Sequence, residues 1–477
     1  MNLITALEQN SLINNTKGGK YYASTFNANL NLFSGASRFD SEFKCVNKFI
    51  QAYNEDKELA LANLLYILDI REGKGERRVF KTIFKYLCNA YPCDAKKILP
   101  HIGSLGRYDY ILEGLHTLIE EDVVCLIKET LKSDLQSNNP TLLAKWLPSH
   151  RTHGKTNEVA RYLMKKLGVS EKEYRQMLSK LRSKINIVEK NLTEKQYENI
   201  VFDEVPTKAM LKYTAAFSRN IGERFTEYKK SLVKGETKVN TKGLFCHEVI
   251  NKVLRGGCDK TILNAMRESQ KTIDLGESNV LVVADTSGSM RYYDELPYYA
   301  SLGLATYTAE RNKGIFKNRF ITFSSEPTLQ EVNGVDITSK VRGIKTINSN
   351  TNIDKVFRLI LKSMKDSNAS QADLPSHIII ISDMEFDQGV YSKGGTNFDG
   401  WRKAFMKEGY ELPKIVFWNV SCNTRGFPVT KNNKDVVMIS GFSTNILENI
   451  MNLEEFTPMA QMLKALDKYI NLIQIEG

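Results

Sequence analysis

The stretch Asn279–Ser289 reads NVLVVADTSGS, and it decides the fold of the second half of the chain. Its first part, Asn279–Asp285, is a short apolar run that ends on an aspartate. Such a run is typical of a strand buried on both faces of a parallel sheet. The second part places hydroxyls at Ser287 and Ser289 on either side of Gly288, which lets a tight turn close. We therefore predict a buried strand whose carboxyl end carries oxygen ligands.

Four further β-rich runs follow, separated by segments that can form helices. The predicted strands are Asn279–Asp285, Asn318–Ser324, His377–Asp383, Lys414–Val420 and Asp435–Ser440. The predicted helices are Leu296–Arg311, Ile353–Met364, Asn397–Lys407 and Asn445–Met451. Continuous apolar strands that alternate with helices predict a doubly wound parallel sheet covered on both faces. In such sheets, ligands bind beyond the carboxyl ends of the strands.

Two later segments are expected to reach the same edge of the sheet as Asp285. Thr351 supplies a hydroxyl in a loop before a helix, and Asp383 ends the third predicted strand. Hard oxygen ligands suit Mg²⁺ or Mn²⁺ rather than a soft metal. A serine-rich turn that caps the next helix would explain Ser287, but neither Thr351 nor Asp383. The predicted metal ligands are Asp285, Ser287, Ser289, Thr351 and Asp383.

The first half of the chain has helical rather than strand periodicity. Apolar residues three and four positions apart predict helices through Leu61–Leu68, Phe80–Leu87, Ile111–Ile119 and Val159–Leu167. Polar turns between them favour a stack of helical hairpins like an α-solenoid, without a fixed repeat length. Ser11–Ser37, rich in Asn, Gly and Ser, is expected to be an irregular arm over the surface. The predicted domains are a helical domain, 1–275, a sheet domain, 276–441, and a helical segment, 442–477, that packs back on the first.

The excess positive charge lies in the first domain. Residues 1–275 carry 44 Lys and Arg against 32 Asp and Glu, while the whole chain has a formal charge of +11. Most of the excess falls in Lys145–Lys190, where aromatic residues are interleaved, as is typical of a phosphate-backbone binder. A solvated helical face is the alternative. The candidate RNA-binding residues are Arg71, Lys74, Arg77, Arg78, Arg107, Lys145, His150, Arg151, His153, Lys155, Arg161 and Lys165.

Composition excludes several classes of protein. With 42% hydrophobic and 25% charged residues, the chain is globular rather than disordered. Its apolar runs are far shorter than the roughly 20 residues of a membrane span, so we expect no membrane association. Seven scattered cysteines suit reduced thiols in the cytoplasm better than disulfides or zinc. Neither a nucleotide-binding loop nor a Ser/His/Asp nucleophile motif is present, and we expect no enzyme activity.

The three loops around Asp285, Thr351 and Asp383 resemble the metal-ion-dependent adhesion site of von Willebrand factor A (vWA) domains. The resemblance implies that Ser287, Ser289 and Thr351 bind the metal directly, whereas Asp285 and Asp383 act mostly through coordinated water. It also implies one open coordination position for the carboxylate of a partner. Ser349-Asn-Thr-Asn departs from the commoner Gly-Gly-Thr form of the second loop, which bears on metal affinity more than on fold.

A helical domain followed by a vWA domain is similar to the Ro RNA-binding autoantigens, whose TROVE module is a ring of HEAT-like helical repeats. The chain resembles more closely an uncharacterised bacterial, viral and plant family of the same layout. The residues that carry this resemblance are Arg71–Arg78, Pro100–Tyr110, Lys145–Pro148, Val416–Val420 and Ser440–Ser443. It implies a ribonucleoprotein that binds small or single-stranded RNA, with Mg²⁺ in the vWA domain docking an acidic protein partner. The alternative is a divalent-metal-dependent protein-binding scaffold with no RNA role.

Overall fold

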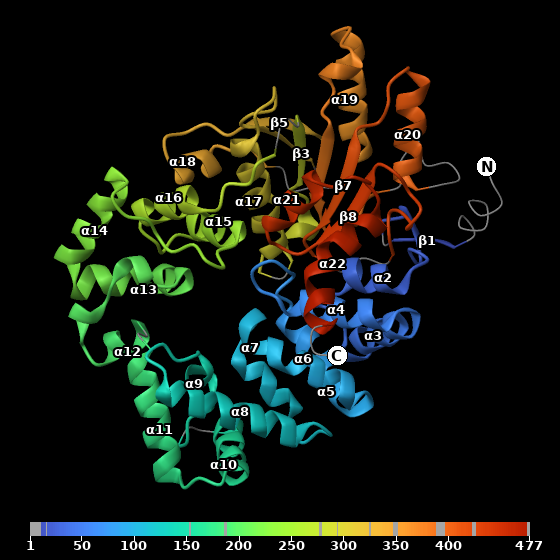
Figure 1. The fold of residues 1–477 in the computed structure, drawn as a ribbon. Coiled ribbons are helices and arrows are strands. Elements are labelled where there is room, and N and C mark those ends of the chain that lie inside the picture. Colours follow the sequence, from blue (N-terminus) through green and yellow to red (C-terminus); the bar gives the residue numbers. More distant parts are fainter. Residues whose placement is uncertain are drawn as a thin grey trace. The chain divides into compact units, whose positions relative to one another are not determined.

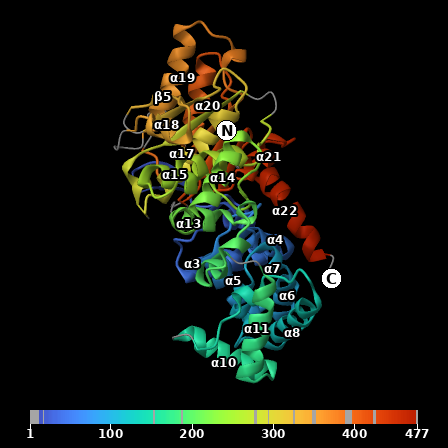
Figure 2. The same cartoon turned by 90° about the vertical axis from the view of Figure 1, so that its left-hand side faces the viewer.

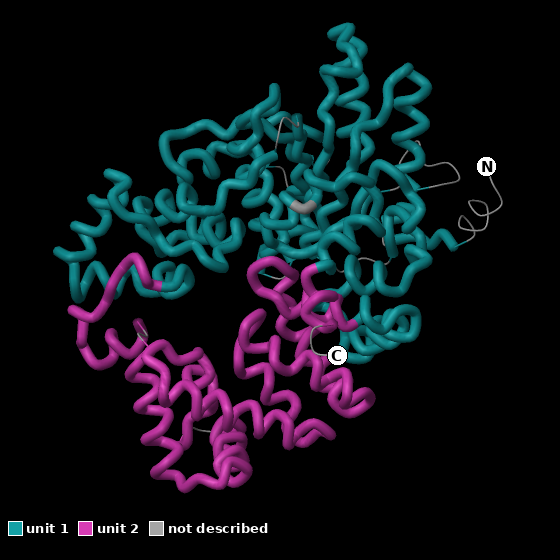
Figure 3. The backbone as a smooth tube through the Cα atoms, in the orientation of Figure 1, with its two compact units in different colours: residues 1–60, 206–467 teal, residues 61–205, 468–477 magenta. Residues whose placement is uncertain are grey.

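A computed structural model describes most of the chain, and its residues fall into two compact units (Figure 3). The described residues are 11–15, 17–151, 154–185, 188–275, 279–292, 294–323, 326–346, 352–387, 396–421 and 426–474. Unit 1 consists of residues 1–60 and 206–467, and unit 2 of residues 61–205 and 468–477. This division differs from the predicted domain boundaries, because the N-terminal segment and residues 206–275 both belong with the sheet.

Unit 1 is built around a six-stranded sheet with the order β5-β4-β3-β6-β7-β8 (Figure 1). The strands are β3 (Val280–Asp285), β4 (Arg319–Phe323), β5 (Thr328–Glu331), β6 (His377–Ser382), β7 (Lys414–Asn419) and β8 (Val436–Ser440). All neighbours pair in parallel except β5, which runs antiparallel to β4 at the edge. Every residue of β3 and β6 is buried, so both faces of the sheet are covered. The predicted strands are confirmed, and β5 is an addition to them.

The order of the strands reverses between β3 and β6. From β3 the chain proceeds outward through β4 to β5, and then returns to β6 on the other side of β3. Such a switch point opens a crevice at the carboxyl ends of the two central strands, because their connections leave in opposite directions. The sequence Asp285–Ser289 and residue Asp383 both follow directly from these two strands. The topology therefore places the predicted carboxylates at the edge where a ligand is expected.

Most of the remaining elements of unit 1 are helices, several of which cover the sheet. Those within and after the sheet are η5 (Gly288–Arg291), α17 (Leu296–Arg311), α18 (Ile337–Arg342), α19 (Asp354–Asp366), η6 (Gln371–Asp373), α20 (Asn397–Lys407), α21 (Asn445–Met451) and α22 (Pro458–Gln474). Those before it are α2 (Ala28–Gly35), α3 (Glu42–Glu55), α4 (Lys57–Leu68), α13 (Thr207–Asn220), α14 (Gly222–Lys234), α15 (Cys246–Arg255) and α16 (Lys260–Ser269). Two of the three unit boundaries fall within α4 and α22, and the third lies between Val205 and Pro206, just before α13.

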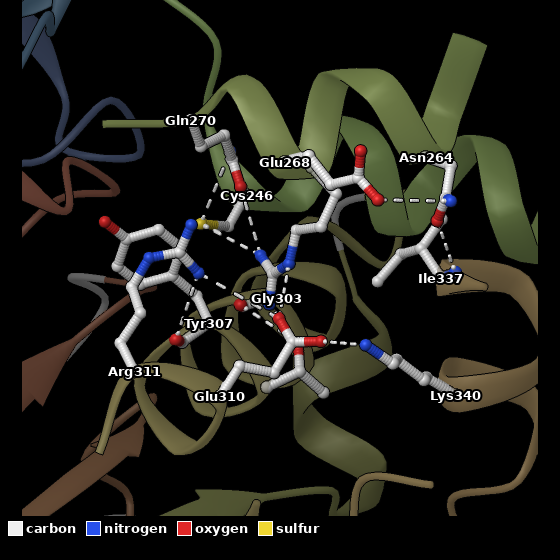
Figure 4. A network of polar contacts seen from close by, with 12 residues as sticks. Cys246, Asn264, Glu268, Gln270, Gly303, Tyr307, Glu310, Arg311, Ile337 and Lys340 are labelled. Atoms are coloured by element: carbon white, nitrogen blue, oxygen red, sulfur yellow. Dashed lines mark hydrogen bonds and ion pairs between the residues drawn. The ribbon is translucent and has the colours of Figure 1, made fainter. Parts of the chain in front are cut away.

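Helix α17 is the central helix of unit 1, since it packs against β3, β4 and β6 and also against α15. Gly303 permits the close approach of α15, because a Cβ atom added there would lie 2.9 Å from the Cβ of Cys246. A buried polar network adds to this contact (Figure 4). Arg267 of α16 donates to Glu310 of α17 at 2.9 Å, and Lys340 of α18 lies 3.0 Å from the same carboxylate. These contacts explain why residues 246–269 group with the sheet.

The described elements of unit 2 are all helical. They are α5 (Arg77–Ala90), α6 (Pro92–Ile98), η1 (Leu99–His101), α7 (Ile102–Leu105), η2 (Tyr108–Gly114), α8 (Glu120–Gln136), α9 (Leu143–Trp146), α10 (Lys155–Leu167), α11 (Glu171–Lys184), α12 (Val188–Thr193), η3 (Tyr197–Asn199) and η4 (Phe202–Glu204). Helices α10 and α11 both pack on α8 (Figures 1 and 2). The last two turns of α22 also belong to this unit, where Tyr469 donates to Asp69 at 2.9 Å.

Two local predictions were wrong. The expected α-helix through Ile111–Ile119 is a 3-10 helix that ends at Gly114, because His116 adopts a left-handed backbone conformation with φ 60°. The expected surface arm at Ser11–Ser37 instead forms a two-stranded hairpin, β1 (Leu12–Asn14) and β2 (Lys20–Tyr22), followed by α2. Tyr21 and Tyr22 are buried, as are most of the apolar side chains of α2. Among the described residues, no helix has both the length and the apolar composition needed to cross a bilayer.

Candidate functional site

Two aspartates meet at the switch point of the sheet. Asp285 is the last residue of β3 and is fully buried, and Asp383 directly follows β6 and is 5% exposed. The hydroxyl of Ser382 lies between them: its Oγ donates to Asp285 Oδ2 at 2.5 Å and lies 3.5 Å from Asp383 Oδ1. Backbone amides hold the two carboxylates in place, since Ser287 N donates to Asp285 and Glu385 N donates to Asp383. Both carboxylates are thereby fixed at one edge.

The turn after β3 brings two serine hydroxyls to the same place. Ser287 Oγ and Ser289 Oγ lie 3.2 Å apart, with Gly288 between them at the start of η5. Thr286 points elsewhere, since its hydroxyl and its amide both donate to the carbonyl of Phe323. Side chains alternate through the turn. The hydroxyls of Ser287 and Ser289 therefore lie on the side of the carboxylates, whereas the hydroxyl of Thr286 bonds to the end of β4.

Burial makes this edge unfavourable for negative charge. Removal from water, and after it the charge of Asp383, raise the pKa of Asp285 well above its ordinary value, while hydrogen bonds from Ser382 and Ser287 act in the opposite direction. Two carboxylates that share a buried site are stabilised by a cation. The arrangement can therefore hold a positive charge among two carboxylates and two hydroxyls, which are hard oxygen donors.

The set of donors fits a small divalent cation. Neighbouring ligands of an octahedral Mg²⁺ at about 2.1 Å from the metal lie about 3 Å apart, close to the separation of the two serine hydroxyls. Within the described ranges, no group of three or more His, Cys, Asp or Glu side chains is placed to hold a metal ion. The candidate thus depends on hydroxyl ligands as well as carboxylates. Of the five predicted ligands, Thr351 lies outside the described residues, and the structure brings the other four together.

Sequence reasoning missed two residues at this edge. Ser382, which bridges the two carboxylates, could have been found, because its place before Asp383 puts it at the end of a predicted strand. Lys17, in the turn of the N-terminal hairpin, lies with its Nζ 3.4 Å from Ser289 Oγ. Lys17 and Ser289 are 272 residues apart in the sequence, and no motif near Lys17 indicates the contact.

The candidate RNA-binding residues lie in unit 2, where some of them surround two aromatic rings. The guanidinium of Arg107 lies 3.7 Å from the centre of the Trp146 ring, and Lys145 Nζ is 5.7 Å from the same centre. Arg77 and Arg107 both lie over Tyr110, at 5.6 and 5.7 Å, and both pair with Asp109. Cations and aromatic faces thus occur together, with part of the charge neutralised by one aspartate.

Three other predicted residues lie on the exposed surface of α10, which we call the α10 basic face: Lys155, Arg161 and Lys165. At helical spacing the three positions fall on one side of the helix. Within the described part of the chain, none of the three forms an ion pair. By contrast, Arg151 pairs with Glu171 at 2.9 Å, and His150 Nδ1 lies 3.0 Å from that carboxylate. The α10 basic face therefore carries charge that the described residues do not neutralise.

The remaining predicted residues, Arg71, Lys74, Arg78 and His153, are not part of the α10 basic face. Lys74 is 2% exposed, and Arg71 donates to the carbonyl of Ser104 at 2.7 Å. Arg78 is exposed, and His153 lies outside the described residues. Two basic residues of the same segment have structural roles: Arg182 donates to the carbonyls of Ala144 and Leu147, and Lys184 to those of Leu135 and Ser137. The basic segment is thus partly structural.

The fold and the edge residues define a class: a helical unit joined to a mixed α/β unit with an oxygen-rich site at the sheet's switch point. Residues 279–469 match a domain of unknown function, DUF7788, and residues 117–284 match a second one, DUF2828. The two matches overlap over residues 279–284, which include most of β3. The chain is also similar to uncharacterized protein L728 of Acanthamoeba polyphaga mimivirus, with 29% identity over 95% of this chain and 87% of that protein.

Proposed function

We propose that this protein binds Mg²⁺ or Mn²⁺ at the carboxyl edge of β3 and β6 and uses the cation to dock an acidic group of a partner protein. The observation that carries the proposal is the pair of buried carboxylates, Asp285 and Asp383, beside two hydroxyls 3.2 Å apart. Asp285, Ser287, Ser289 and Asp383 would hold the cation, with Thr351 as a further ligand. The cation would supply an electrophilic position for a carboxylate. The strand order supports, as part of the same proposal, assignment of this region as a vWA domain.

Direct measurement of metal binding tests the first half of the proposal. Titration of the full chain with Mn²⁺, followed by electron paramagnetic resonance, should reveal a site that Asp285→Asn weakens about 100-fold or more, because the variant removes a charge from a buried site. Asp366→Asn is the matched control, since Asp366 is an exposed aspartate at the end of α19 in the same unit. Equal affinities for the two variants would remove the metal from this edge.

Partner docking is tested by capture from a cell extract with the wild-type protein as bait. Partners that use the metal should be retained in Mg²⁺ and lost in EDTA, and they should be lost from Asp285→Asn but not from Asp366→Asn. Retention that ignores both EDTA and the Asp285→Asn variant would contradict docking through the cation, even if the metal site itself is real.

A second function, RNA binding, is supported by a different observation in unit 2. The α10 basic face, Lys155, Arg161 and Lys165, carries three exposed cations without ion pairs among the described residues. Trp146 is half-buried beside Arg107 and Lys145, and aromatic faces flanked by cations are suited to stacking of unpaired bases. Assignment of unit 2 as a HEAT-like, TROVE-like module and of the protein as a ribonucleoprotein belongs to this proposal.

Filter binding to single-stranded RNA at several salt concentrations tests this second function. About six phosphate contacts to a single strand would lower the affinity roughly 300-fold between 50 and 200 mM salt. Replacing the α10 basic face by glutamine should reduce the magnitude of the logarithmic salt slope by about 2, since each contact to a single strand contributes about 0.7. The control replaces three exposed lysines of unit 1, Lys362, Lys403 and Lys407, which changes the net charge equally. Equal slopes for the two triple variants would contradict the proposal.

Neither function requires the protein to transform its ligand chemically. A cation that is held by hydroxyls and carboxylates and completed by a partner's carboxylate recognises a group rather than activating water. We therefore propose a binding protein rather than an enzyme. A reducing compartment such as the cytoplasm belongs to the same proposal, because Cys45, Cys88, Cys93, Cys125, Cys246 and Cys258 are free thiols.

A further inference from the structure

The N-terminal hairpin, Leu12–Tyr22, is fastened to the loop that follows Asp383. The side-chain amide of Asn15 donates to the carbonyl of Phe386 at 2.8 Å, and the hydroxyl of Tyr21 donates to the carbonyl of Met384. Gly18 forms a β-bridge with Asp387. Asn15 is 7% exposed and Tyr21 is 3% exposed. Polar groups of the hairpin thus form a buried connection to the candidate metal edge, which a loosely attached arm would lack.

Several contacts hold the described residues of the hairpin turn, Asn15 and Lys17–Gly19. The Asn15 side-chain oxygen accepts from Gly19 N at 2.7 Å and from Lys17 N at 3.0 Å, so one asparagine holds two backbone amides of the turn. Gly19 lies so close to the loop that an added Cβ atom would be 2.5 Å from the carbonyl oxygen of Phe386. The backbone of Lys17 is therefore held over the edge, and its side chain reaches Ser289.

We propose that Lys17 is a tethered cation that competes with the divalent metal ion for the carboxyl edge of β3 and β6. This inference rests on the proposed metal site and adds its regulation. A metal ion about 2.1 Å from Ser289 Oγ would lie within about 6 Å of Lys17 Nζ, which is itself 3.4 Å from that oxygen. Two positive charges at that separation repel each other even at the dielectric constant of water.

The competition has a consequence for the hairpin. Because coupling between two sites is reciprocal, a metal ion that is weakened by Lys17 must in turn drive the Lys17 side chain away from Ser289. The buried anchors at Asn15 and Tyr21 keep the hairpin attached while the ammonium group leaves. Metal loading then converts a closed edge, with its charge balanced internally, into one that is open to a partner's carboxylate.

Metal affinities of two charge-matched variants test the inference. Lys17→Met should bind Mn²⁺ at least about tenfold more tightly than wild type. A change of this size corresponds to the repulsion between a divalent metal ion and an ammonium group about 5–6 Å apart at the dielectric constant of water. Lys20→Met removes the same charge from β2 of the same hairpin, and its affinity for Mn²⁺ should stay within about twofold of wild type.

Chemical modification of lysine provides a second measurement. In wild type, Mg²⁺ should accelerate acylation of the Lys17 amine, measured by mass spectrometry, and should leave the acylation rate of Lys20 unchanged.

The outcomes separate this inference from the function on which it rests. A gain in affinity for Lys17→Met that exceeds the gain for Lys20→Met supports the competition. Equal affinities of the two variants, or weaker binding by Lys17→Met, overturn the competition and leave the metal site standing. Absence of Mn²⁺ binding by wild type and by both variants overturns the metal site, and the inference with it. Gly19→Ala, which forces the turn away from Phe386 without removing a charge, should mimic Lys17→Met.

Discussion

The acidic edge of unit 1 and the basic surface of unit 2 both gather like charges, but they do so at very different cost. Asp285 and Asp383 are buried and are held in place by strand ends and backbone amides, so their mutual repulsion is not relieved by water. Lys155, Arg161 and Lys165 extend from α10 into solvent, where like charges are screened. A buried set of like charges therefore indicates a ligand by its geometry, whereas an exposed set does so only through a binding measurement.

Ion pairs in the two units also differ in burial. The loss of a buried pair should change the free energy of unfolding more than any other substitution predicted for this protein. In unit 1, Glu310→Gln leaves Arg267, which is 5% exposed, without its counter-charge on Glu310, whose side chain is 13% exposed. We expect a loss of about 3–5 kcal/mol in the free energy of unfolding, as for other buried pairs that lose one partner. In unit 2, Glu171→Gln removes the charged partner of the exposed Arg151 and keeps an oxygen near His150 Nδ1, so we expect a loss below about 1 kcal/mol. Urea denaturation followed by tryptophan fluorescence and circular dichroism measures both.

A small effect of Glu310→Gln would contradict the comparison between buried and exposed ion pairs, because it would mean that water stabilises the guanidinium of Arg267 without Glu310. Arg267→Met is the companion variant. It removes the buried charge together with its need for a partner, so it should cost less than Glu310→Gln. Equal costs for the two would point to lost packing between α16 and α17 rather than to electrostatics.

Unit 1 also contains a buried histidine, and the cost of giving it a positive charge predicts how the stability of the protein depends on pH. His377 begins β6, the strand that ends before Asp383, and burial followed by the charge of Lys414 lowers its pKa to about 4. Its ring faces Lys414, Ser376 and Phe456, none of which is acidic. In the unfolded chain the residue takes up a proton near pH 6.5, whereas in the folded chain it does so only near pH 4.

Stability should therefore fall as the pH drops from 6.5 to about 4 and should lose no more from this residue below that. His377 alone contributes up to about 3 kcal/mol across this window. Thermal unfolding of wild type and His377→Asn at several pH values checks this, and the variant should show a shallower decline. Parallel curves would mean that His377 is protonated in the folded protein. His247, whose pKa is lowered to about 3 by burial, should add to the decline in both proteins.

The sheet and most of its edge residues could be predicted from the sequence because both depend on local patterns. Apolar runs such as Val280–Asp285 form strands wherever both faces are covered, and the residue after each strand falls at the edge. Asp285, Ser287, Ser289 and Asp383 are found in this way. The edge strand β5 was missed because only one of its four residues is buried, so it lacks an apolar run. The helix expected at Ile111–Ile119 failed because apolar spacing does not reveal the left-handed backbone of His116.

The contribution of the N-terminal hairpin could not be predicted for a different reason. Its composition of Asn, Gly and Ser is typical of an irregular loop, and its order comes from contacts with residues more than 360 positions away. No periodicity encodes such contacts. Unit 2 shows a related limit, since a count of basic residues cannot distinguish Arg182, which binds backbone carbonyls, from Lys165, which faces solvent.

The smallest expected effect decides whether the acidic edge is a ligand site or merely a structural turn. In EDTA, Asp285→Asn should raise the free energy of unfolding by roughly 1 kcal/mol, because it removes one of two buried like charges and keeps an oxygen for the Ser287 amide. In saturating Mg²⁺ the order should reverse, since only wild type gains stability by binding. Residues that serve a ligand commonly lower the stability of the free protein, whereas residues that only cap a turn raise it. The contrary outcome is that Asp285→Asn destabilises the protein in EDTA as well as in Mg²⁺, while Asp366→Asn has no effect in either. Asp285 would then be a structural hydrogen-bond acceptor, and the α10 basic face would be the stronger candidate for a functional site.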